Sequence, residues 1–67
     1  MRGIITYTDF GDGKGMLTVY GPDDNMAWLT ALPKPGGQTR MFLGWENLQL
    51  IADYTKGKLK ARIDRIV

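Results

Sequence analysis

The interpretation of the fold depends on the stretch Gly44-Trp45-Glu46-Asn47-Leu48-Gln49-Leu50-Ile51-Ala52-Asp53-Tyr54-Thr55-Lys56-Gly57-Lys58. Projected at about 100° per residue, its apolar side chains cover most of a helix surface. Glu46, Gln49 and Asp53, at i, i+3 and i+7, form the single polar stripe. Gly57 occupies a position typical of a helix end, and the flanking lysines suit the negative end of the helix dipole. The stretch therefore predicts a helix over 45–54 that needs burial on nearly all sides.

The segment that follows this stretch is basic. Residues 56–67 carry three Lys and two Arg against one Asp, a net charge of +4, whereas residues 1–55 have a net charge of −2. Apolar and charged residues alternate along 58–64, which predicts a strand with the charged side chains facing outward. A helix fits 58–66 equally well by spacing, because Leu59, Ile63, Ile66 and Val67 fall at i, i+4, i+7 and i+8. We prefer the strand because Gly57 is a good helix stop.

The N-terminal part predicts a β-hairpin. Residues 3–8 and 16–20 are rich in β-branched and aromatic side chains, and a Gly/Asp-rich loop separates them. The expected inward face of the hairpin contains Ile5, Tyr7, Leu17 and Val19. The expected outward face contains Thr6, Thr8, Thr18 and Tyr20.

The middle of the chain allows two interpretations. Pro22 and the acids after it are typical of a helix start, and apolar residues recur at helical spacing until Pro33, so we expect a helix over 22–32. The competing interpretation is a strand between two turns at 21–25 and 34–38. A glycine- and proline-rich loop follows Pro33, and residues 39–43 then predict a further strand.

These elements predict one small α+β domain over 1–67. Its order is β-β-α-β-α-β, an antiparallel sheet with both helices on one face. The alternative is a four-strand meander, close to a small barrel, plus one helix.

Composition argues against an enzyme and against metal or cofactor chemistry. The 67 residues include no Cys, His or Ser, so the common nucleophile–base pairs, thiolate metal sites and the commonest metal ligand, histidine, are absent from the sequence. The adjacent acids Asp23 and Asp24 are interpreted as partners of a helix dipole. The glycines at 11, 13 and 15 lie between two predicted strands, which indicates a hairpin tip and not a nucleotide-binding loop. No apolar run has the length of a membrane span and no signal peptide is evident, so we expect a cytoplasmic protein without a membrane partner.

Two binding functions remain, and the first is nucleic-acid or other anion binding. Alternating cations on a strand lie roughly 7 Å apart on one face, close to the phosphate repeat of a nucleic acid. Exposed aromatic residues, among them Tyr7, Tyr20, Phe10 or Trp28, would add stacking surfaces. The expected nucleic-acid-binding residues are Lys56, Lys58, Lys60, Arg62 and Arg65.

The second function is that of a protein-binding adaptor or inhibitor. The helix over 45–54 carries more apolar surface than one packing face needs, and the remainder requires a protein partner or a second copy in a homodimer. A small self-contained chain of this kind is typical of a phage or other mobile element. The expected partner-binding residues are Trp45, Leu48, Leu50, Ile51 and Tyr54.

Overall fold

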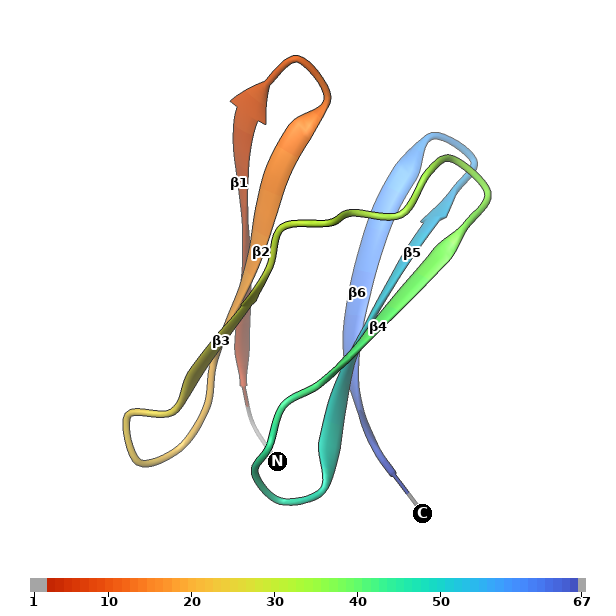
Figure 1. The fold of residues 1–67 in the computed structure, drawn as a ribbon. Coiled ribbons are helices and arrows are strands. Elements are labelled where there is room, and N and C mark those ends of the chain that lie inside the picture. The colour runs from red at the N-terminus through yellow and green to blue at the C-terminus, as the bar shows by residue number, and fades with distance from the viewer. Residues whose placement is uncertain (1–2, 67) are drawn as a thin grey trace. The chain divides into compact units, whose positions relative to one another are not determined.

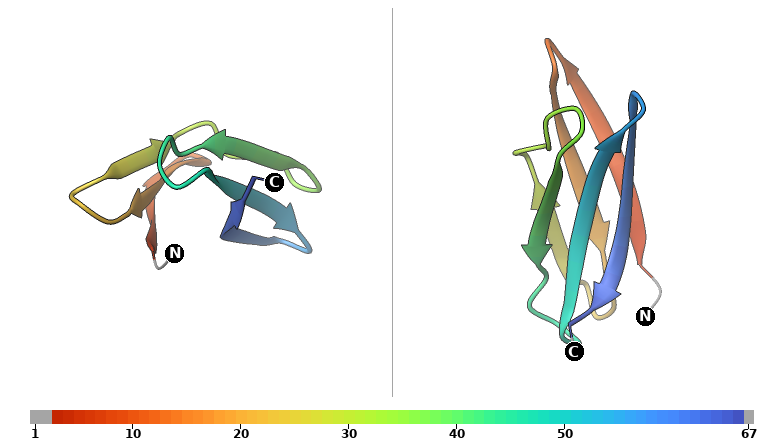
Figure 2. Two further views of the ribbon diagram at one scale, coloured as in Figure 1. Left: turned by 90° about the horizontal axis from the view of Figure 1, so that it is seen from below. Right: turned by 90° about the vertical axis from the view of Figure 1, so that its right-hand side faces the viewer.

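A computed structural model describes residues 3–66, and these residues form strands and turns without any helix (Figure 1). The chain divides into two compact units, which we call unit 1 (Met1–Leu32) and unit 2 (Pro33–Val67). Each unit holds one three-stranded antiparallel sheet, and Figure 2 shows both sheets from two further sides. The predicted α+β fold with helices on one face is therefore wrong. The prediction of a single domain over 1–67 stays a prediction.

Unit 1 contains β1 (Ile4–Gly11), β2 (Lys14–Tyr20) and β3 (Met26–Leu29), in the order β1-β2-β3. The predicted hairpin is confirmed, with Ile5 opposite Val19 and Tyr7 opposite Leu17 on the predicted shared face. The expected division into inward and outward faces holds only in part, because Tyr7 is 49% exposed and Thr18 is 6% exposed. The ring of Tyr7 lies over Gly15, where a Cβ atom would come within 2.6 Å of it. A side chain at that position would therefore displace the ring, which explains a glycine inside β2.

The predicted helix over 22–32 is wrong, and the competing strand interpretation is confirmed as β3. The chain turns instead at Pro22–Asn25, where the backbone N–H of Asn25 donates to the carbonyl of Pro22 at 3.0 Å. Asp23 and Asp24 have φ values of 56° and 61°, the left-handed region that Asp tolerates better than most residues. Acids and a proline that favour the first turn of a helix thus also favour this tight hairpin turn.

Unit 2 contains β4 (Gln38–Phe42), β5 (Leu48–Thr55) and β6 (Lys58–Arg65), in the order β4-β5-β6. The strands predicted at 39–43 and 58–64 are confirmed. The predicted helix over 45–54 is wrong, and so is the one-helix alternative, because β5 occupies most of this segment. A turn at Trp45–Leu48 precedes β5, and the backbone N–H of Leu48 donates to the carbonyl of Trp45 at 3.2 Å.

The strand β5 is buried on one face, and a single apolar residue is buried on the other. Leu48, Leu50 and Ala52 occupy one face with exposed fractions of 3%, 0% and 0%, and Ile51 occupies the other with 1%. The remaining residues on the face of Ile51, which are Gln49, Asp53 and Thr55, are polar and half-buried or exposed, so Ile51 alone interrupts the alternation of a strand with one solvated face. Among the described residues, no helix is long and apolar enough to cross a membrane.

Candidate nucleic-acid interface

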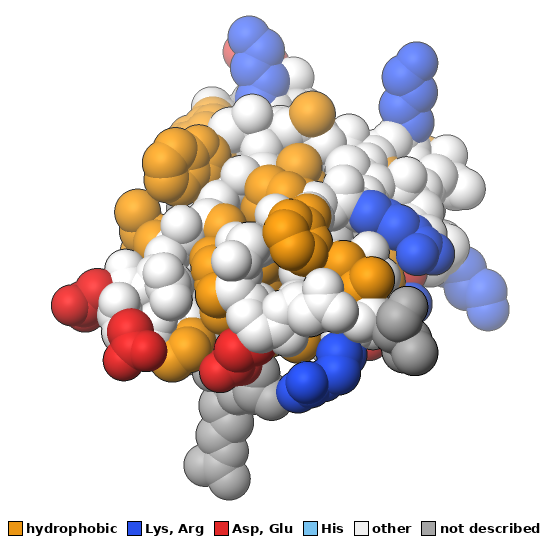
Figure 3. Space-filling view, turned by 60° about the horizontal axis from the view of Figure 1, so that its bottom comes forward, with side chains coloured by type: hydrophobic (Ala, Val, Ile, Leu, Met, Phe, Trp, Pro, Cys, Tyr) orange, Lys and Arg blue, Asp and Glu red, His pale blue; other side chains and the backbone are white. Residues whose placement is uncertain are grey.

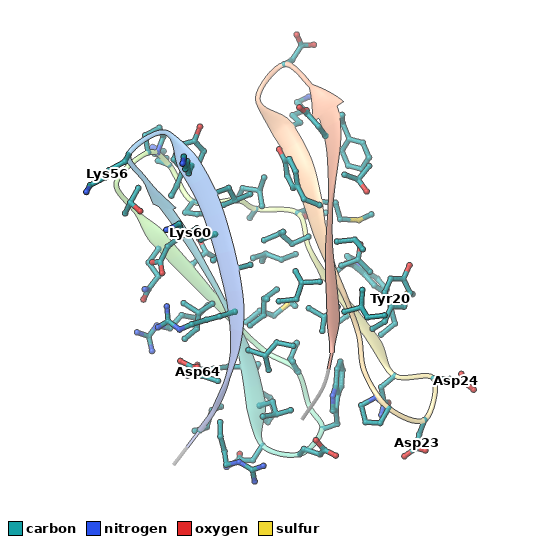
Figure 4. The ribbon with its side chains drawn as sticks, turned by 180° about the vertical axis from the view of Figure 1, so that it is seen from behind. Tyr20, Asp23, Asp24, Lys56, Lys60 and Asp64 are labelled. Carbon is teal, nitrogen blue, oxygen red and sulfur yellow. The ribbon has the colours of Figure 1, made fainter. Side chains whose placement is uncertain are left out.

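The predicted cations of the C-terminal segment divide between the two faces of unit 2. Lys58, Lys60 and Arg62 occupy alternate positions of β6, so they share one face at roughly 7 Å spacing. Lys56 lies in the turn before β6 and projects from the hairpin tip (Figure 4). Arg65 is out of phase with these three residues and lies opposite Leu48, on the other face of the sheet.

The pairing of the strands places residues of β4 and β5 on the same face as Lys58, Lys60 and Arg62. Arg40, Ile51 and Arg62 form one cross-strand row. The neighbouring rows follow the same pairing, and we call the whole surface the cationic face. It consists of Gln38, Arg40, Phe42, Gln49, Ile51, Asp53, Thr55, Lys58, Lys60, Arg62 and Asp64.

Arg62 is held by two carboxylates of this face. Its Nη1 lies 3.2 Å from Oδ2 of Asp53, and its Nε lies 3.1 Å from Oδ2 of Asp64. The hydrogen bond and charge of Asp64, followed by those of Asp53, raise the pKa of Arg62 above its ordinary value. The two acids therefore compensate much of the charge that Arg62 would present to an anion.

The same network continues to the other edge of the sheet. Nε2 of Gln38 donates to Oδ1 of Asp53 at 2.6 Å. Nε of Arg40 in turn donates to Oε1 of Gln38 at 2.8 Å. Two arginines and two acids are thus linked across β4, β5 and β6, and the middle of the cationic face carries little net charge.

The excess positive charge lies on the lysines. Lys56, Lys58 and Lys60 are exposed, and within the described residues none has a carboxylate in ion-pair distance. Lys34 belongs to the same end of unit 2, because its loop is bonded to the end of β5. The backbone N–H of Gly36 donates to the carbonyl of Tyr54 at 2.6 Å, and the N–H of Tyr54 donates to the carbonyl of Gly37 at 3.0 Å.

A depression of about 240 Å³ lies beside these lysines. Asp53, Lys60, Ala61 and Arg62 line it. Both oxygens of Asp53 already accept hydrogen bonds, Oδ1 from Gln38 and Oδ2 from Arg62. The Lys60 ammonium group has no carboxylate within ion-pair distance in the described residues, and such a group suits a phosphate oxygen.

One exposed aromatic ring shares the cationic face, and the sequence did not single it out. Phe42 is 60% exposed and lies opposite Gln49, two positions along β4 from Arg40. The aromatic residues proposed from sequence as stacking surfaces are also exposed, with fractions between 48% and 60%, but all of them lie in unit 1: Tyr7, Phe10, Tyr20 and Trp28. The signal available for Phe42 was its i, i+2 spacing from Arg40 in a predicted strand.

The predicted partner-binding residues do not form a common exposed surface. Leu48, Leu50 and Ile51 are buried in β5, and Leu50 and Ile51 point to opposite faces of it. Trp45 and Tyr54 are half-buried. The indole N–H of Trp45 is buried and has no hydrogen-bond acceptor within the described part of the chain.

Unit 1 instead exposes apolar side chains on the hairpin face that was predicted to be outward and rich in threonine. Ile4, Tyr20 and Met26 form one cross-strand row with exposed fractions of 66%, 48% and 48%. Trp28, 56% exposed, occupies the next row beside Thr18. Hydrophobic side chains are visible at the molecular surface in Figure 3. The apolar part of this face was overlooked because Met26 and Trp28 were expected on a helix.

Residues 3–66 bring together no group of three or more Asp, Glu, His or Cys side chains that would hold a metal ion. No protein-family model, curated protein or solved structure matches the chain. In the part of the chain that the structure describes, the exposed surfaces of the two units are therefore the only indication of function.

Proposed function

We propose that unit 2 binds the phosphate backbone of a single-stranded nucleic acid on its cationic face. The observation that carries the proposal is the group of three exposed lysines, Lys56, Lys58 and Lys60, on one hairpin without carboxylate partners in residues 3–66. Unit 2 as a whole has seven Lys and Arg against three acids, a net charge of +4, whereas unit 1 has a net charge of −2. Anions are therefore attracted to unit 2 in preference to unit 1.

Phe42 favours a single strand over a duplex in this proposal. An exposed ring on a cationic sheet offers a base a stacking surface, and unpaired bases are free to use it. The lysine side chains are flexible point charges that contact phosphates without reading base edges. We therefore expect weak sequence preference and strong dependence of affinity on salt. A cytoplasmic location is part of the same proposal.

Protein binding through a helix over 45–54 has no structural basis, because residues 48–55 form β5. Arg65 is not among the nucleic-acid-binding residues that we propose, because Arg65 lies on the opposite face of β6 from Lys58, Lys60 and Arg62. This separation gives a charge-matched test within one strand.

The test measures fluorescence anisotropy of a labelled oligothymidylate titrated with the protein at low salt. Lys58→Glu and Arg65→Glu change the net charge equally but act on opposite faces of β6. We expect Lys58→Glu to weaken binding by at least about tenfold and Arg65→Glu to change it by less than about threefold. Equal weakening by both variants would mean that only the overall charge matters, and absence of wild-type binding at low salt would refute the proposal.

A further inference from the structure

The edge strand β1 differs from the other exposed sheet edges of the described chain. A sheet edge presents unpaired N–H and C=O groups, and proteins protect it with charge, proline, bulges or short length. Strand β3 is protected by its short length of four residues and by the preceding turn that contains Pro22. Strand β4 is protected by its length of five residues and by the charge of Arg40. Along β6 there are four basic residues. Each of these three edges has at least one protective feature.

None of these features protects the first five residues of β1. Ile4-Ile5-Thr6-Tyr7-Thr8 contains no charged residue and no proline, and its pairing with β2 is regular. The first charge of the strand is Asp9, and the register shift between Asp9 and Gly11 follows it. In the described residues β1 pairs with β2 alone, so one side of this uncharged strand lacks a partner.

The uncharged segment is also complementary to itself. If two copies run antiparallel about a two-fold axis at Thr6, Ile4 faces Thr8, Ile5 faces Tyr7 and Thr6 faces its own copy. Pairs of β-branched with aromatic residues, and of threonine with threonine, are among those that stabilise antiparallel sheets. This axis pairs the whole of residues 4–8 with itself and leaves Asp9 opposite Gly3 instead of opposite another acid. A two-fold arrangement is the commonest symmetry of protein dimers.

We propose that β1 pairs with β1 of a second copy of the chain, antiparallel and centred on Thr6, so that two unit 1 sheets form one six-stranded sheet. Ile4, Thr6 and Thr8 then continue the exposed face of unit 1 across the junction, because antiparallel pairing keeps equivalent residues on the same side of a sheet. The proposal is independent of nucleic-acid binding, which was assigned to unit 2.

The test uses sedimentation velocity over a range of protein concentrations. We expect the wild type to reach twice the 7.5 kDa mass of the chain as concentration rises. Thr6→Lys and Thr6→Glu each place like charges opposite one another at the axis, so each variant should remain at one chain mass over that range. An equimolar mixture of the two should again reach twice the chain mass. Thr30→Lys, an exposed position of unit 1 outside its strands, is the matched control and should dimerise like the wild type.

A second measurement does not depend on charge. Because the chain has no cysteine, Thr6→Cys can form only an intermolecular disulfide. We expect Thr6→Cys to give covalent dimers under mild oxidation much faster than Thr30→Cys. A wild type that stays monomeric at every concentration would overturn the proposal, as would a dimer that survives Thr6→Lys or equal crosslinking of the two cysteine variants. A monomer that pairs with an extended peptide of another protein would also overturn it, because the occupant would then not be a second copy.

Discussion

Replacing Lys56 by Asn tests the corrected structure of the 44–58 region directly. Lys56 and Gly57 form the turn between β5 and β6, and their φ values of 52° and 73° are both positive. Positive φ at both central residues is the requirement of a type I′ turn, which Asn-Gly satisfies best. For a residue other than Gly, Asn or Asp, the left-handed backbone conformation is unfavourable by roughly 1–2 kcal/mol, and replacing Lys56 by Asn removes part of this unfavourable energy.

We therefore expect Lys56→Asn to raise the free energy of unfolding by about 0.5–1 kcal/mol. For a domain of this size the melting temperature should rise by roughly 2–8 °C. A helix ending at Gly57 gives the opposite expectation, because a lysine there stabilises the helix dipole and its loss costs about 0.3–1 kcal/mol. The sign of the change thus distinguishes the hairpin from the helix.

The assay is thermal unfolding followed by circular dichroism, with Lys60→Asn as the control. That variant removes the same charge from a position inside β6, where Asn is disfavoured, and it should lower the melting temperature. Lys56→Asn should also weaken oligonucleotide binding, so its stability and its affinity change in opposite directions. A melting temperature that falls equally in both variants would refute the turn assignment.

Three further predictions concern the binding surface and the core. With Lys56, Lys58 and Lys60 contacting phosphates, log K should fall with log salt at a slope of about −2, so affinity drops about twentyfold from 50 to 200 mM salt. Each single Lys→Gln variant should reduce the slope by about 0.7, and a slope unchanged in all three would contradict their role. Phe42→Ala should weaken oligonucleotide binding by roughly 5- to 150-fold, whereas Phe10→Ala, equally exposed in unit 1, should leave it nearly unchanged; similar losses in both would argue against stacking on unit 2. Leu50→Ala should lower the free energy of unfolding by about 2–5 kcal/mol, most of the stability of so small a chain, as measured by denaturant unfolding. The control Met26→Ala, at an exposed position, should change the free energy of unfolding by less than about 0.5 kcal/mol.

The candidate site was partly predictable from the sequence. Alternation along 58–64 correctly placed Lys58, Lys60 and Arg62 on one face of a strand. The sequence did not reveal that Asp53 compensates Arg62, because these residues meet through the pairing of β5 with β6. Nor did it reveal that Phe42 shares this face, since the link from β4 to β6 runs through β5.

Local sequence determined the elements whose pattern has one physical explanation. The hairpin of β1 and β2 alternates in polarity around a Gly/Asp loop, and β6 alternates between charged and apolar residues, so strand period and turn chemistry agree in both. The assignments at 22–32 and 45–54 failed where two structures share one pattern. Acids beside a proline suit a helix start as well as a tight turn. The segment 48–55 suits an apolar helix as well as a strand in which Ile51 alone interrupts the alternation of apolar and polar residues.

Only tertiary pairing decided between these structures. Leu50 lies between Met41 and Ile63, and Ile51 lies between Arg40 and Arg62. These partners are 9 to 13 positions away along the chain, and the backbone hydrogen bonds that they share with β5 replace those a helix would have formed within itself. The sequence determined which residues are apolar, charged or turn-forming. The neighbouring strands determined that the apolar stretch is extended, because an extended β5 brings its apolar side chains against those of both neighbours.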